Sequence, residues 1–257
     1  MKKTLLDLKR YLFSPLFAIA VLAALAIMVY PIYDSLKDIF EHPQSYLYYI
    51  GGIHTFGTFD LFAPIIASIP CSTTFYNDLG TGYCKFILPR TGRIKYLLSK
   101  IFVCGITGGF AISLPNFILF LYLLIFGKPH LSGTYVMLQN TIFENIEFAN
   151  NGLNVMLILL LLSFLFGTAW SLIGLATSAF FPTMYTALTA PFMIYFSLST
   201  ILSITEGTLV YSPMNMLYPN YSHIPSLAFC FIYQLVLILV SATVFFLCAN
   251  RRLKNAL

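Results

Sequence analysis

The chain has 257 residues, of which 59% are hydrophobic and 9% are charged, and its mean hydropathy is +0.84. An ordinary soluble domain carries about 25% charged residues, so this composition excludes a soluble globular protein and predicts an integral membrane protein. Lys and Arg total 14 against 9 acids, an excess that membrane topology explains better than nucleic-acid binding does.

The first thirteen residues form an amphipathic pattern. Leu5, Leu8 and Leu12 recur at helical spacing, and the cations Lys2, Lys3, Lys9 and Arg10 fall on other faces. This pattern predicts a helix that lies along the inner membrane surface, with its apolar stripe in the lipid and its cations at anionic headgroups. The alternative is a set of basic residues that only orients the next span.

Six apolar segments follow, each long enough to cross a bilayer. We expect transmembrane spans over residues 16–33, 59–76, 101–126, 155–180, 184–204 and 227–249. Pro64 and Pro70 should bend the second span. No cleavage site follows the first apolar run, so we expect that it is retained as a span.

Small residues on two spans indicate close helix packing. Gly105 and Gly109 form a GxxxG pair, and Ser163, Gly167 and Ser171 lie four residues apart. The five cysteines show no metal-binding spacing, so we interpret them as buried, unreactive thiols.

Charge sets the predicted orientation. With the N-terminus inside, twelve of the 14 cations lie on the cytosolic side, and Lys37 and Lys128 lie outside. We therefore predict a multi-pass protein of the plasma membrane with both termini in the cytosol.

The spans carry little chemistry of their own. The histidines His42, His54, His130 and His223 are scattered over predicted outer connections, and no phosphate-binding loop occurs. Asp60 is the only ionisable candidate within the spans, and we interpret it as an interfacial carboxylate. An ion-coupled carrier usually needs more, so it is disfavoured.

The stretch from Asn77 to Lys100 reads NDLGTGYCKFILPRTGRIKYLLSK and is basic. We expect a short helix over residues 79–88 that presents Tyr83, Phe86 and Ile87 beside Lys85. A turn over residues 89–92 should follow, and then a helix that begins near Arg93, is capped by Thr91 and continues into the third span. A solvated basic loop is the alternative.

The order of Asp78, a glycine, an apolar stretch, Pro-Arg-Thr-Gly-Arg at 89–93 and Ser-Lys before a span resembles the coupling segment of type-2 ATP-binding cassette permeases. The chain departs from many members of that family in carrying aspartate rather than glutamate at position 78. The resemblance extends to the amphipathic N-terminal helix, the six spans and a hydrophobic element between the last two.

This resemblance implies an all-α, polytopic fold with six transmembrane helices, an N-terminal interface helix and a cytosolic coupling helix. The chain would pair with a second permease subunit and bind two separate ATPase subunits. It would be neither an enzyme nor a cofactor-binding protein, because ATP and Mg²⁺ would bind to the ATPase partners. Its ATPase-coupling interface would comprise Asp78, Gly80, Tyr83, Lys85, Phe86, Pro89, Arg90, Arg93 and Lys100.

The resemblance also implies an external element over residues 205–226, near the exit of the substrate path. Its apolar side chains are Met214, Met216, Leu217, Tyr218 and Tyr221. The substrate would be an amphipathic peptide, a drug or a lipid, and antimicrobial peptide resistance would be one outcome. The alternatives are a non-transporting immunity or sensor protein that binds a peptide externally, a small membrane enzyme acting on lipid, or an ion-coupled carrier.

Overall fold

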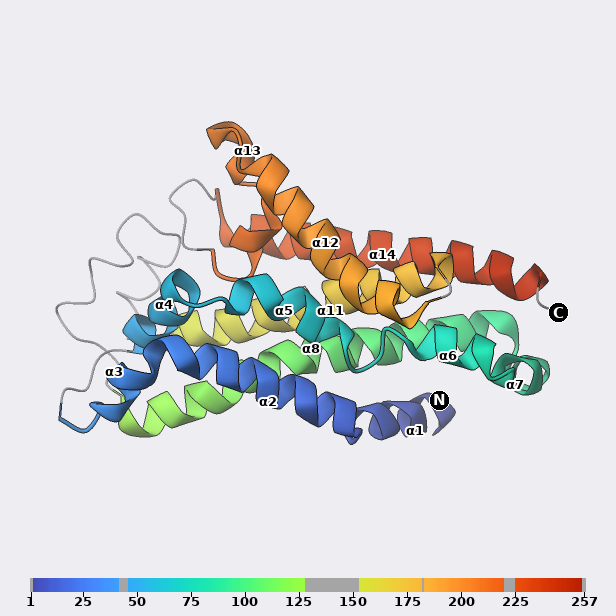
Figure 1. Ribbon diagram of the computed structural model, residues 1–257, viewed down its shortest axis with the longest axis horizontal. Coiled ribbons are helices and arrows are strands. Elements are labelled where there is room, and N and C mark those ends of the chain that lie inside the picture. The colour runs from blue at the N-terminus through green and yellow to red at the C-terminus, as the bar shows by residue number, and fades with distance from the viewer. Residues whose placement is uncertain (1, 42–45, 128–152, 182, 220–224, 256–257) are drawn as a thin grey trace.

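The computed structural model describes residues 2–41, 46–127, 153–181, 183–219 and 225–255, and these residues form helices, turns and connections without strands. Figure 1 shows an elongated bundle whose long helices run mostly along one axis, with α12 crossing obliquely. Both termini lie at one end, which we call the basic end, together with α1 (Lys2–Leu12), α6 (Thr74–Gly80) and α7 (Tyr83–Thr91). The opposite end carries α3 (Tyr33–Lys37), α4 (Tyr46–Phe56) and α13 (Glu206–Leu209).

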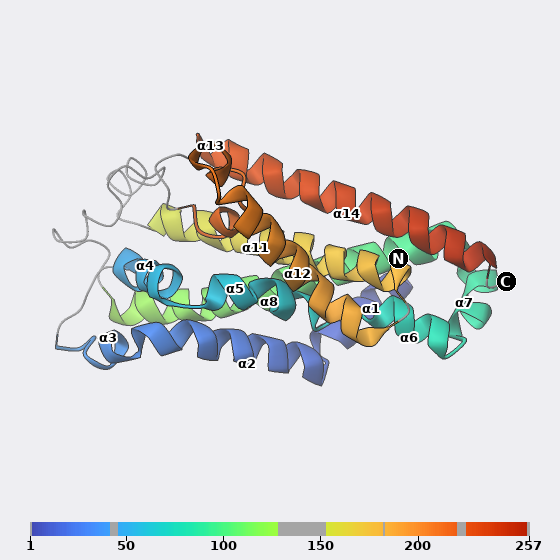
Figure 2. The same cartoon turned by 45° about the horizontal axis from the view of Figure 1, so that its top comes forward.

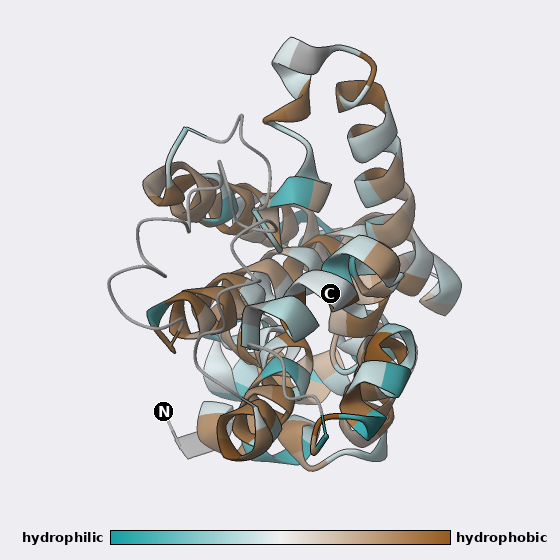
Figure 3. Cartoon of the chain, turned by 90° about the vertical axis from the view of Figure 1, so that its left-hand side faces the viewer, coloured by the Kyte–Doolittle hydropathy of each residue, from teal (hydrophilic) through white to brown (hydrophobic). Residues whose placement is uncertain are grey.

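Five helices are long and apolar enough to cross a membrane, and a sixth span is counted if the bent pair α4–α5 is one span. The five are Pro15–Lys37, which is α2 (Pro15–Val29) continued by η1 (Tyr30–Ile32) and α3, then α8 (Arg93–Phe126), α11 (Leu153–Phe180), α12 (Met184–Leu202) and α14 (Leu227–Asn255). Figure 3 shows much of these helices coloured as hydrophobic, and large apolar side chains such as Leu22 and Leu239 are 65% exposed. Such outer faces suit a lipid environment, so the chain is a multi-pass membrane protein.

The span expected over residues 59–76, bent by Pro64 and Pro70, is interrupted in the structure. α5 (Phe59–Ser68) is 10 residues long, and the chain then turns through Pro70 before α6 begins at Thr74. α4, which precedes it at an angle of 84°, lies where a polar connection was expected. Pro70 lacks a backbone donor, so a helix that continued through this position would lose one of its hydrogen bonds.

The centre of the bundle is the contact between α8 and α11, which runs along the molecule in both views (Figures 1 and 2). A Cβ on Gly108 would collide with Ser171, and one on Gly167 would collide with the carbonyl of Gly108. Thr168 Oγ1 also donates to the Gly105 carbonyl at 3.1 Å, and Ser171 Oγ donates to that of Cys104 at 3.1 Å. The two stripes of small residues therefore pack against each other and bring these helix backbones close together.

Candidate functional site

The basic segment between α5 and α8 forms a helical hairpin made of α6 and α7. Gly82, with φ at 70°, separates these two helices, and Gly92, with φ at 76° and ψ at 150°, separates α7 from α8. The expected helix over residues 79–88 is thus replaced by two helices, and Pro89 lies inside α7 instead of in a turn. Thr91 does not cap α8 either, because its Oγ1 donates back to the Ile87 carbonyl at 2.9 Å.

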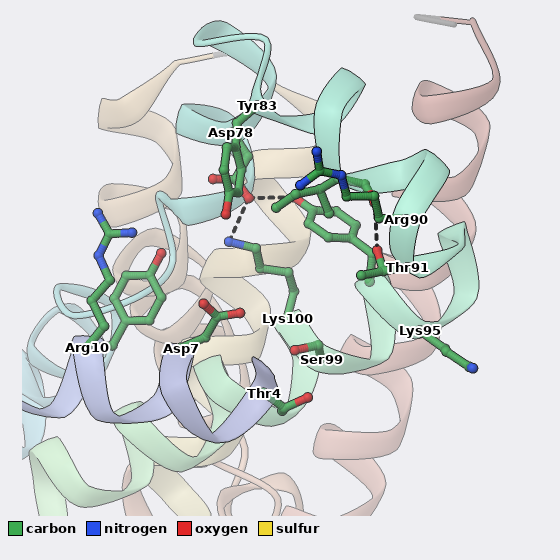
Figure 4. Close-up of a pocket in the computed structure, with 13 residues that line it drawn as sticks. Thr4, Asp7, Arg10, Asp78, Tyr83, Arg90, Thr91, Lys95, Ser99 and Lys100 are labelled. Carbon is green, nitrogen blue, oxygen red and sulfur yellow. Dashed lines mark hydrogen bonds and ion pairs between the residues drawn. The ribbon is translucent and has the colours of Figure 1, made fainter. Parts of the chain in front are cut away.

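An ion pair joins this hairpin to α8. Lys100 Nζ lies 2.8 Å from Asp78 Oδ2, and the side chains of Lys100 and Asp78 are 11% and 15% exposed. The Tyr96 hydroxyl donates to the same carboxylate oxygen at 2.6 Å (Figure 4). Removing one partner of such a buried pair would leave an uncompensated charge, so the cluster fixes how α6 lies on α8.

The N-terminal helix α1 contacts the same cluster. Lys100 Nζ lies 5.8 Å from the ring centroids of both Tyr11 and Tyr96, a distance at which cation–π attraction operates. Burial raises the pKa of the Tyr11 hydroxyl above its ordinary value. Leu8 and Tyr11 pack against the hydrophobic core, whereas Leu5 is 70% exposed and Lys9 and Arg10 are exposed. One face of the described part of α1 therefore packs on α8, and its other face, which carries Leu5, Lys9 and Arg10, is exposed.

A cavity of about 260 Å³ opens beside this cluster, between α1, α7 and α8 (Figure 4). Arg10, Arg90 and Lys95 line it together with Asp7. In the part of the chain that the structure describes, the salt bridges are those of Lys100 with Asp78 and of His54 with Asp60. The cavity therefore presents cations that form no salt bridge, a composition suited to an acidic partner or an anionic headgroup.

The other predicted coupling residues divide between the two sides of α7. Cys84, Ile87 and Leu88 are buried against the bundle, and burial raises the pKa of the Cys84 thiol. On the outer side, Phe86 is 73% and Tyr83 43% exposed. Three further residues of the outer side, Lys85, Pro89 and Arg90, are exposed, as is Gly80 at the end of α6, and Arg93 is half-buried. Phe86 and Lys85 thus lie on the outer face, while Tyr83 and Arg90 are exposed and also line the cavity beside the Asp78–Lys100 pair.

A second polar pair lies near the opposite end, where sequence reasoning did not find one. His54 Nδ1 is 2.6 Å from Asp60 Oδ1, with side chains only 6% and 9% exposed. Asp60 is therefore a buried, paired carboxylate. The six-residue spacing gave no signal, because it joins two residues only when the chain bends sharply between them. His42, His130 and His223 lie outside the described residues.

The predicted external element is folded onto the bundle. η2 (Pro213–Met216) carries Met214, which is 45% exposed, while Met216, Leu217 and Tyr218 are buried. Tyr221 lies outside the described residues. The five cysteines are free, with Cys71, Cys84, Cys104 and Cys230 buried and Cys248 half-buried.

Comparisons with protein-family models, with curated proteins and with solved structures found no match to this chain.

Proposed function

We propose that this chain is the membrane subunit of an ATP-driven exporter whose ATPase is a separate protein. The observation that carries this proposal is the buried Asp78–Lys100 pair, which joins the hairpin to α8. α8 has 34 residues, a length of about 50 Å at 1.5 Å per residue, so it continues from the hairpin through the whole bundle. A force applied to the hairpin would therefore move a transmembrane helix as a rigid lever.

The outer face of α7 is the proposed binding surface for the ATPase. Phe86 and Tyr83 are exposed beside Lys85 and Arg90. Aromatic and arginine side chains dominate the binding energy of most protein interfaces, because they bury a large area and form directed hydrogen bonds. Asp78 and Lys100 would act indirectly, since they hold the hairpin in place.

The charge and hydrophobicity of the bundle indicate its orientation and the kind of substrate. The cations of α1, the hairpin and the end of α14 gather at the basic end, which would face the cytosol in a plasma-membrane protein. Two copies, or this chain and a second permease subunit, would bind two ATPases that hold ATP and Mg²⁺. An amphipathic peptide, drug or lipid would move between the two membrane subunits, since many outward-facing side chains of the long helices are large and apolar.

The test is purification of the chain from its native membrane, followed by identification of any bound ATPase that has a phosphate-binding loop. Arg90→Glu with Arg93→Glu should abolish ATPase binding or uncouple ATP hydrolysis while membrane insertion is retained. The matched control is Arg251→Glu with Lys254→Glu, a charge reversal at the same end of the bundle but on α14, which should leave binding unchanged.

Retention of stable, coupled ATPase binding by the double variant at Arg90 and Arg93 would contradict this binding surface. Full activity of the purified chain without any ATPase would instead favour a non-transporting sensor or immunity protein.

A further inference from the structure

A second hollow adjoins the basic cavity that lies between α1, α7 and α8. The basic cavity has a volume of about 260 Å³, near the lower end of small-molecule sites, which begin at about 300 Å³. The second hollow has a volume of about 660 Å³ and lies between α1, the start of α2 and α6. Four residues line both spaces, which therefore lie side by side: Arg10, Tyr11, Asp78 and Tyr83.

The lining of the basic cavity suits a phosphate group. Arg10 and Arg90 extend from α1 and α7 on either side of the Asp78–Lys100 pair (Figure 4), and both are exposed and form no salt bridge within the described part of the chain. The guanidinium group presents a fork of donors that matches the oxygens of a phosphate. An anion that enters this cavity would therefore meet two arginines whose charge is not already neutralised.

The polar groups below the arginines suit a headgroup that carries hydroxyls. Asp7, Thr4 and Ser99 line the cavity and are half-buried. A carboxylate repels a phosphate but accepts a hydrogen bond from a hydroxyl, and the threonine and serine hydroxyls can donate or accept. A phosphate that bears glycerol, with hydroxyls beside the anionic group, therefore matches this lining better than a bare phosphate does.

The second hollow is apolar where the chain enters the membrane. Phe13 and Leu16 line it, and both are exposed. The exposed apolar surface continues at Ile19 on α2, which belongs to a membrane span. Since Arg10 lines both spaces, a phosphate held by this residue lies beside a surface that suits acyl chains. A free phosphate would leave that surface unused, whereas a phospholipid would cover it.

We propose that the basic cavity binds the headgroup of an anionic phospholipid, with its phosphate between Arg10 and Arg90 and its acyl chains on Phe13 and Leu16. The bound lipid links α1 to α7 through its phosphate and thereby holds the hairpin at the membrane surface. This proposal goes beyond the proposed function, because it requires no ATPase and holds whether or not one binds to the outer face of α7.

The test is native mass spectrometry of the full chain in micelles of a nonionic detergent, with phosphatidylglycerol and phosphatidylcholine of the same acyl chains as probes. The natural chain should bind a single phosphatidylglycerol about tenfold more tightly than phosphatidylcholine, whose headgroup has no net charge. Arg10→Gln with Arg90→Gln should weaken the binding of phosphatidylglycerol about tenfold or more and remove this preference.

The matched control is Lys9→Gln with Arg251→Gln. It removes the same charge from exposed residues of the basic end that do not line the cavity, so its affinity for phosphatidylglycerol should stay within about twofold of the natural value. Equal losses in the two double variants would overturn the proposal, because they would show a diffuse attraction to the basic end. Equal affinity of the natural chain for the two lipids would also overturn it.

Two soluble probes separate a lipid from a free phosphate. Inorganic phosphate and glycerol phosphate carry the anionic group without acyl chains, and neither should bind as tightly as phosphatidylglycerol. Equal affinity for either of them would overturn the lipid as the occupant. Because the sample contains no ATPase, its outcome is independent of the test of the proposed function.

Thermal unfolding of the same samples shows whether each variant is folded. Arg10 and Arg90 are exposed, so the double variant should keep the natural melting temperature. If it does not, Arg10→Gln alone replaces it and should weaken the binding of phosphatidylglycerol about threefold or more, against no change for Lys9→Gln. Natural affinity in folded Arg10→Gln would overturn the proposal.

Discussion

Lys100 Nζ and Asp78 Oδ2 lie 2.8 Å apart, and this contact joins the start of α8 to the hairpin that precedes it. Tyr96, one helical turn before Lys100, donates to the same carboxylate oxygen at 2.6 Å. Because Tyr96 and Lys100 share one face of α8, a single carboxylate on α6 fixes both the position and the rotation of the hairpin.

Replacing Lys100 should therefore destabilise the protein. Lys100→Met leaves the Asp78 carboxylate buried with one hydrogen bond and no cation, which should lower the free energy of unfolding by about 3–5 kcal/mol. The measurement is unfolding in mixed micelles, with the exposed Lys95→Met as control, expected within about 0.5 kcal/mol of the natural chain. The double variant Asp78→Asn with Lys100→Met should lose less free energy of unfolding than the two single variants lose in sum. Simple additivity of the two losses would contradict the pairing.

Cys84 offers a chemical reporter for the same contact. Its side chain is buried, and burial raises the pKa of its thiol, so less of the reactive thiolate is present at neutral pH. Alkylation of Cys84 by a maleimide, followed by peptide mass spectrometry, should be at least about tenfold slower in the folded protein than after denaturation, and should accelerate as the pH rises. Lys100→Met should accelerate it at constant pH. Equal rates in folded and denatured protein would contradict the burial of the hairpin's inner face.

The membrane character of this fold follows from composition, but the bend at residues 57–58 does not. Apolar length locates α8, α11, α12 and α14, because a span is a local property of about twenty residues. The contact of His54 with Asp60 depends instead on an 84° change of direction between two short helices. Neither residue signals this change, and Gly57 is one of 15 glycines in the chain.

The hairpin of α6 and α7 is likewise predictable from the sequence only in part. Its basic charge and its place before α8 are readable from the sequence, whereas the role of Asp78 is not. An acid in a basic segment is equally compatible with a partner contact and with an internal ion pair, and only its distance from Lys100 distinguishes the two.

The glycines that bound α7 should respond differently to substitution. Gly82 has φ and ψ of 70° and 7°, a left-handed conformation that asparagine tolerates. Gly92 has φ and ψ of 76° and 150°, a region accessible almost only to glycine. Gly92→Asn should therefore lower the free energy of unfolding by about 1–3 kcal/mol, and Gly82→Asn by less than about 1 kcal/mol. Thermal unfolding of both variants in the same micelles checks this, and equal losses would contradict the backbone geometry.

Two neighbouring residues of α7 separate stability from partner binding. Ile87 is 8% exposed and packs in the core, so Ile87→Ala should lower the free energy of unfolding by about 2–5 kcal/mol. Phe86 is 73% exposed, so Phe86→Ala should change it by no more than about 0.5 kcal/mol. If the outer face of α7 binds the ATPase, Phe86→Ala should nevertheless weaken that binding about tenfold or more, since an exposed aromatic side chain gains its contacts only in the complex. Unfolding in micelles and titration of the purified ATPase measure the two effects separately. A stable Phe86→Ala protein with unchanged ATPase affinity would mean that the partner binds elsewhere on the basic end.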